Sequence, residues 1–133
     1  FIGKDRLLKR PEYIKVKDIM IKKPVTIRPE RTLTQALEKM RLHKVDSLMV
    51  VDEFGNFIGI ATSNDILDNF GNGGTVIEIT RTEFNHVNED ANVNQVLSIM
   101  AQGQVGYVPV IDDEKHLLGL VTRSSLVNVL GRA

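Results

Sequence analysis

The stretch GIATSND, residues 59–65, occurs a second time in altered form as GLVTRSS at residues 119–125. In both copies a short apolar run ends at a threonine, and the chain turns polar immediately after it. The first copy then carries an acid, Asp65, where the second carries Ser125. A segment that occurs once with an acid and once without it predicts two related sites with different roles.

The sixty-residue offset between these stretches aligns most of the chain without a gap, which indicates an internal repeat. Identical pairs at this offset include Val16 with Val76, Gln35 with Gln95, Met40 with Met100, Asp52 with Asp112 and Thr62 with Thr122. The sequence therefore predicts two copies of one unit, at residues 16–70 and 76–131. Residues 1–15 have no repeat partner, and we expect them to connect to a further domain upstream, with Pro11 breaking any helix.

Helical periodicity follows the first part of each copy. TLTQALEKMRLH at 32–43 places apolar residues at helical spacing, and Thr32 with Gln35 forms a capping box. NVNQVLSIMAQG at 92–103 repeats the pattern with Asn92 as N-cap and Gly103 as the expected stop. Each copy therefore predicts a helix of about three turns.

Two short apolar runs follow each of these helices. SLMVVD and FIGIAT surround a turn that contains Gly55, and YVPVID and LLGLVT are their counterparts, so each pair predicts a β-hairpin. A second helix is expected directly after Thr62 and after Thr122. The predicted class is α+β, with two β-α-β-β-α units. Units of about 55 residues bury little surface alone, so we expect them to pack sheet to sheet around a pseudo-twofold axis.

Composition limits the classes of function. The chain has 133 residues, no cysteine and no apolar run of the roughly 20 residues that span a bilayer. Residues 1–44 hold thirteen Lys or Arg and five Asp or Glu, but aromatic residues do not interleave with them, so nucleic acid is not an expected partner. The three histidines lie far apart and no phosphate-binding GxxxxGK[ST] loop occurs, so neither catalysis nor a metal site is expected.

The repeat, the order of elements and the GIATSND signature together resemble a tandem pair of CBS domains, also called a Bateman module. The resemblance covers nearly the whole chain and implies that Thr62 and Asp65 contact the phosphate and ribose of an adenosine nucleotide such as AMP or ATP. A helix N-terminus favours phosphate, which agrees with this role. The alternative interpretation is that both residues only cap the strand and the helix.

The second copy departs from the family pattern. Ser125 lacks the charge to hold a ribose diol, whereas Arg123 could pair with a phosphate and Tyr107, in place of Ser47, could stack on adenine. These changes predict a different nucleotide site in this copy. The alternative is that Arg123 is solvated and Tyr107 packs on a neighbour.

A narrower resemblance concerns the opening stretch FIGKDRLLKRPEYIKVKDIM. It is similar to the junction after the ATPase domain of bacterial importers for glycine betaine, carnitine or choline, some of which carry CBS pairs that bind cyclic di-AMP at a dimer cleft. The resemblance implies an osmoregulatory homodimer, attached to an ATPase and to membrane permease subunits, in the cytoplasm at the inner face of the membrane. The residues that it implies for the ligand are Val25, Thr26, Val45, Ser47, Tyr107, Leu120, Thr122 and Arg123.

Binding of cyclic di-AMP is expected to inhibit transport. Two alternatives remain open at this stage. One is AMP or ATP bound at Thr62 and Asp65. The other is a ligand-free dimerisation module that senses ionic strength through its basic part, residues 4–44.

Overall fold

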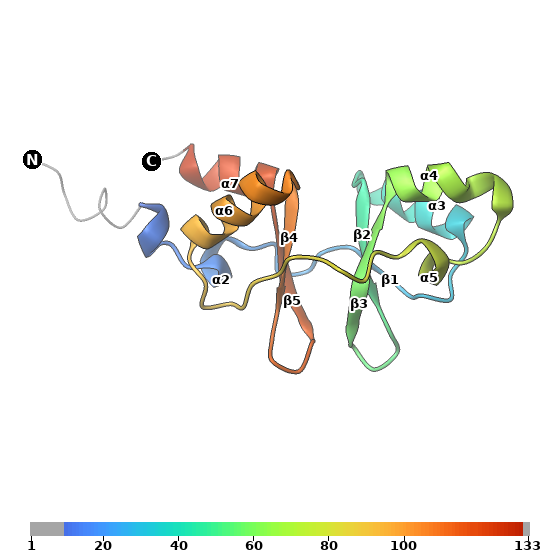
Figure 1. Ribbon diagram of the computed structural model, residues 1–133, viewed down its shortest axis with the longest axis horizontal. Coiled ribbons are helices and arrows are strands. Elements are labelled where there is room, and N and C mark those ends of the chain that lie inside the picture. The colour runs from blue at the N-terminus through green and yellow to red at the C-terminus, as the bar shows by residue number, and fades with distance from the viewer. Residues whose placement is uncertain (1–9, 132–133) are drawn as a thin grey trace, which may run out of the picture. The chain divides into compact units, whose positions relative to one another are not determined.

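The computed structural model describes residues 10–131 (Figure 1). The chain forms two compact units. Unit 2 runs from Pro24 to Phe84, and unit 1 combines the segment that ends at Lys23 with the segment that begins at Asn85. Each unit has its own apolar core.

Unit 2 contains a three-stranded sheet in the order β1-β2-β3. Strand β1 pairs in parallel with β2, and β2 pairs antiparallel with β3. Figure 1 shows α3 and α4 at one end of this hairpin and its turn at the other. The elements are β1 (Thr26–Ile27), α3 (Leu33–His43), β2 (Ser47–Val51), β3 (Phe57–Thr62), α4 (Ser63–Asn69), η2 (Phe70–Asn72) and α5 (Val76–Ile79).

Unit 1 repeats this arrangement around the hairpin β4–β5, which is antiparallel. An isolated parallel bridge from Val87 to Val110 takes the place of β1. The elements are η1 (Pro11–Tyr13), α2 (Val16–Ile19), α6 (Val93–Gly103), β4 (Tyr107–Ile111), β5 (Leu117–Thr122) and α7 (Arg123–Leu130).

The opening segment of each sequence copy packs in the unit that holds the helices of the other copy. Val16 is fully buried in the core of unit 1, where its backbone N–H donates to Ala91 O at 2.8 Å. Val76 is fully buried in the core of unit 2, and its N–H donates to Arg31 O at 2.8 Å. The two units are therefore built from exchanged segments of the two sequence copies.

The α+β class, the four helices and the two hairpins are confirmed, as are the capping boxes at Thr32 and Asn92. The aligned residues Met40 and Met100 are both buried, one in the core of each unit. Of the expected connector, residues 1–9 lie outside the described part of the chain.

Strand β1 forms in the extended part expected ahead of the first long helix, and the bridge from Val87 to Val110 is its counterpart in the second copy. The one-turn helices α2 and α5, at the start of each copy, were not expected. At the start of α5, Glu78 Oε2 accepts from the backbone N–H of Thr75 at 3.0 Å, as the acid of a capping box does. Gly103 is the last residue of α6, and the left-handed cap is Gln104, with φ of 51°.

Candidate functional site

In unit 2 the junction of β3 and α4 holds the residues of the GIATSND stretch. Thr62 ends the strand opposite Ser47 and is the N-cap of α4, and its Oγ1 accepts from the backbone N–H of Asp65 at 3.2 Å. The same hydroxyl donates to Asp65 Oδ2 at 2.8 Å. Thr62 and Asp65 are thus brought together, in the arrangement of a capped helix start.

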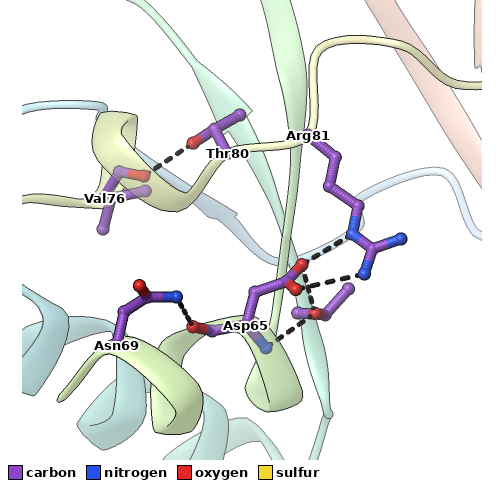
Figure 2. A network of polar contacts seen from close by, with 6 residues as sticks. Asp65, Asn69, Val76, Thr80 and Arg81 are labelled. Carbon is purple, nitrogen blue, oxygen red and sulfur yellow. Dashed lines mark hydrogen bonds and ion pairs between the residues drawn. The ribbon is translucent and has the colours of Figure 1, made fainter.

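Asp65 already has a cationic partner. The Nε of Arg81 donates to Asp65 Oδ2 at 2.6 Å and its Nη2 donates to Oδ1 at 3.1 Å, as Figure 2 shows. The hydrogen bonds from Arg81, aided by the one from Thr62, hold the pKa of the Asp65 carboxyl below its ordinary value of 3.8, against the opposing effect of burial. Both oxygens that could accept a ribose diol are therefore engaged by the guanidinium.

The segment that carries Arg81 is fixed against β3 by its backbone. Ile60 and Arg81 exchange two backbone hydrogen bonds, of 3.0 and 2.9 Å. Gly59 permits this approach, because a Cβ at that position would collide with the carbonyl oxygen of Arg81. Gly119 has the same role in unit 1, where a Cβ would lie 2.8 Å from Ile21 O. The glycine in both copies of the signature is explained by this close approach.

Sequence reasoning missed Arg81 as a site residue. It lies 16 residues after Asp65. The internal repeat relates Arg81 to Ile21, sixty positions earlier, and Ile21 forms the equivalent bridge to Leu120. A cation that replaces an apolar residue at this repeat position was the signal in the sequence that could have indicated Arg81. The acid and its cation are both absent from the second junction, where Ser125 and Ile21 stand in their places.

The junction of β5 and α7 in unit 1 is closed by its own hydrogen bonds. Thr122 Oγ1 accepts from Ser125 N at 3.2 Å, and Ser125 Oγ accepts from Thr122 N at 3.0 Å. Ser125 Oγ also donates to the carbonyl oxygen of Thr122 at 2.8 Å. The Ser125 hydroxyl is therefore occupied by the helix cap.

Arg123 and Tyr107 belong to the same edge of unit 1. Tyr107 begins β4 opposite Thr122, and Arg123 is the first residue of α7. The Arg123 backbone N–H donates to Gly106 O at 3.1 Å, and its Nη2 donates to Val105 O at 3.4 Å. Arg123 is exposed and Tyr107 is half-buried, so the cation and the ring that the sequence singled out share one strand–helix junction.

The remaining ligand residues expected from the sequence divide between the units. Leu120 lies in unit 1 but is 93 % buried, since only 7 % of it is exposed. Four residues lie in unit 2, and three of them are half-buried while Val45 is 36 % exposed. These four are Val25, Thr26, Val45 and Ser47.

Outside the two junctions, the described residues form no cluster suited to a metal ion, and the lowered pKa of Asp112 belongs to a hairpin turn. Within residues 10–131 no group of three or more His, Cys, Asp or Glu side chains is arranged to hold a metal ion. Backbone N–H groups of His116 and Glu114 hold the pKa of Asp112 below its ordinary value, the His116 bond contributing most, which is a hairpin-turn arrangement. No helix in the described part is long and apolar enough to cross a membrane.

The family model described as CBS domain matches residues 16–72 and 76–132. The chain belongs to the CBS domain family. It is a tandem CBS pair, and such pairs are generally regulatory modules rather than catalytic ones. The junctions described above are therefore the two strand–helix edges of a CBS pair.

Among individual proteins, the chain is similar to ATP-binding proteins of osmoprotectant transport. The chain is 39 % identical, over 98 % of its length, to the glycine betaine/carnitine/choline transport ATP-binding protein OpuCA of Bacillus subtilis, of which it spans 34 %. The chain thus covers about a third of the length of this relative. It also matches the solved structure of Staphylococcus aureus OpuCA, with 30 % identity and a TM-score of 0.77 over 87 % of this chain and 98 % of that one.

A third comparison concerns a solved complex. The CBS domain pair of protein MJ0100, in complex with 5′-methylthioadenosine and S-adenosyl-L-methionine, matches with 32 % identity and a TM-score of 0.81. The match covers 89 % of this chain and 96 % of that one. That relative therefore binds adenosine derivatives in the same fold.

Proposed function

We propose that this CBS pair is the nucleotide-sensing regulatory module of an osmoprotectant ABC importer and that its ligand is cyclic di-AMP. The observation that carries the ligand assignment is the junction of β5 and α7, where Arg123 and Tyr107 lie together beside a threonine cap. A guanidinium pairs well with a phosphodiester, and a phenol ring offers a stacking surface for adenine.

The chemistry of the sugar supports the same choice. AMP and ATP present a free 2′,3′-diol, which calls for a carboxylate acceptor. In cyclic di-AMP the 3′ oxygen is part of the phosphodiester, so no vicinal diol remains. Ser125 has no carboxylate and its hydroxyl is used by the cap, which suits a ligand without a diol.

The junction of β3 and α4 supports the same choice, because Arg81 already occupies the carboxylate of Asp65. A nucleotide that used Asp65 for its ribose would have to displace Arg81 from two charge-assisted hydrogen bonds. Such bonds contribute about 1.5–3 kcal/mol each at buried sites and less when the pair is exposed, as the Arg81 side chain is at 59 %. AMP or ATP at Thr62 and Asp65 is the second candidate, favoured by the adenosine derivatives in the MJ0100 complex.

A homodimer completes the proposal. Helices α6 and α7 line an apolar cavity of about 420 Å³, with Arg123 among its lining residues. Val127 on this face is 69 % exposed, and Leu67 on the corresponding helix of unit 2 is 61 % exposed. A second copy that covers this face in a twofold arrangement would place a second Arg123 near the first, matching the two phosphates of the ligand.

Regulation then follows from linkage. Ligand binding at the dimer cleft favours one arrangement of the dimer only if the ligand binds the two arrangements unequally. The attached ATPase domain and the membrane permease subunits would respond to that preference, at the inner face of the membrane. We propose inhibition as the outcome, so that the messenger restrains osmolyte uptake.

Thermal melting of the 133-residue chain tests this function. Cyclic di-AMP, AMP and ATP are each added at matched ionic strength and at two salt concentrations. A rise in melting temperature specific to cyclic di-AMP supports the proposal, since a ligand that binds only the folded state stabilises it. A rise with AMP or ATP alone would instead support the Thr62 and Asp65 site. A strong salt dependence without any nucleotide effect would support the ionic-strength sensor.

A further inference from the structure

A second concave site lies in unit 2, near the hairpin turn. It is a cavity of about 500 Å³, within the range of small-molecule sites. Gln35 and Lys39 lie four residues apart on one face of α3 and line one wall, and Arg31, which precedes the N-cap Thr32, lines the cavity beside them. We call this the basic cavity, and its lining residues are Thr26, Ile27, Arg28, Arg31, Gln35, Lys39, Val51 and Asp52.

The cations of the basic cavity are incompletely neutralised. Among the described residues, the side chains of Arg31 and Lys39 take part in no ion pair. Arg28 Nη2 lies 3.3 Å from Glu30 and 3.9 Å from Glu53, and both of these carboxylate side chains are more than 60 % exposed. The Nε of Arg28 is buried and has no hydrogen-bond partner in the described part of the chain. An unpartnered buried donor beside two free cations favours an anionic ligand.

Asp52, the acidic residue of the lining, accepts its hydrogen bonds from the hairpin turn. Asp52 Oδ1 accepts from the backbone N–H groups of Phe54 and Asn56, both at 2.9 Å. Its Oδ2 accepts from the Asn56 side chain at 3.2 Å. Asp52 therefore serves the hairpin turn, and its carboxylate makes no ion pair of 4.0 Å or less with the cavity cations of the described chain.

The second sequence copy supplies an internal comparison. Unit 1 has a cavity of about 520 Å³ at the corresponding positions. There the three cations are replaced by Asn88, Ala91 and Ile99, whereas Gln95 and Asp112 are retained. The same fold thus forms a cavity of the same size without the cations, so folding does not require Arg28, Arg31 and Lys39.

We propose that the basic cavity binds a small solute that carries two or more phosphate groups. The fork of an arginine matches phosphate oxygens, and two arginines with a lysine suit a ligand with several of them. Apart from Thr26, which is also among the residues expected to contact cyclic di-AMP, the lining of this site is separate from both junctions. Along the β2–β3 hairpin, Val51 pairs with Phe57 near the cavity, whereas Ser47 pairs with Thr62 at the other end.

Calorimetric titration with inorganic pyrophosphate tests the proposal, with sodium chloride keeping the ionic strength constant. The triple variant R28N/R31A/K39I copies the residues of the second copy. We expect saturable binding to the wild type and a loss of at least about tenfold in the variant, because each charge-assisted contact contributes about 1.5–3 kcal/mol. The charge-matched control K22A/K23A/R41A removes three cations outside the cavity and should stay within about twofold.

Several results would overturn the proposal. These are equal affinity in wild type and triple variant, equal loss in the control, and binding to phosphatidylglycerol vesicles or RNA without binding to pyrophosphate. If the triple variant does not fold, R31A/K39A decides, and it must weaken binding at least about fivefold. Binding of cyclic di-AMP should be unchanged in these variants, so a failure here is separable from a failure of the proposed function.

Discussion

Replacing Arg81 by isoleucine, the residue at the equivalent position of the second copy, tests how the Asp65 junction is controlled. The change removes the hydrogen bonds of 2.6 and 3.1 Å from the guanidinium to the two carboxylate oxygens. Asp65 is only 23 % exposed, whereas Arg81 is 59 % exposed, so water screens the pair in part. We therefore expect the free energy of unfolding to fall by about 1 kcal/mol, which is the upper end for a surface ion pair.

The loss should depend on pH in a defined direction. The pKa of Asp65 is lowered in the folded protein, chiefly by its bonds from Arg81, so the pair stabilises the fold above the ordinary value of 3.8. This contribution is lost as the pH falls below that value. At pH 7 Arg81→Ile should melt about 2–5 °C below wild type, and the difference should vanish as Asp65 becomes protonated.

The same substitution should improve AMP binding at the junction. The ligand no longer has to displace the guanidinium, so the AMP affinity should rise by up to about fivefold, the equivalent of about 1 kcal/mol. Titration calorimetry of wild type, Arg81→Ile, Asp65→Asn and the double variant measures this coupling, with Arg41→Ile as a control for lost charge. Weaker AMP binding in Arg81→Ile would show instead that Arg81 helps to hold the nucleotide.

Two further predictions concern stability and use chemical denaturation as the assay. Gly59→Ala should destabilise the protein by about 1–3 kcal/mol, because its Cβ meets the Arg81 carbonyl, whereas Gly71→Ala has nothing within 4 Å and should be near neutral; equal effects would contradict the close approach. Thr32→Ala should cost about 1 kcal/mol by removing the N-cap of α3, while the exposed Thr34→Ala in the same helix should not destabilise. A neutral Thr32→Ala would contradict the cap.

The helices and hairpins were predictable because their signals are local. The capping box of Thr32 and Gln35 and the apolar spacing behind it lie within one short segment. The hairpins were likewise marked by apolar runs on both sides of a polar turn. The repeat supports the same elements twice, since its two copies carry the same pattern.

The features that depend on distant contacts were not predictable in this way. Val16 and Val76 show nothing locally that assigns each to the unit with the other copy's helices. Arg81 reaches Asp65 because its segment runs along β3. Gly59 permits that close approach, but a glycine in a strand does not by itself indicate which segment lies beside it. The basic cavity is lined by Arg28, which follows β1, and by Lys39 of α3. The sequence alone does not show that these two residues line the same cavity.

The cyclic di-AMP site is tested by titrating this ligand into wild type and Arg123→Ala. We expect saturable binding with one ligand per two chains, and an affinity at least about tenfold weaker in Arg123→Ala, since a charge-assisted phosphate contact is lost. The variant Arg28→Asn, which also removes one arginine, should bind as the wild type does. Wild-type affinity in Arg123→Ala, or binding of AMP without binding of cyclic di-AMP, would show that Arg123 and Tyr107 do not form a cyclic di-AMP site.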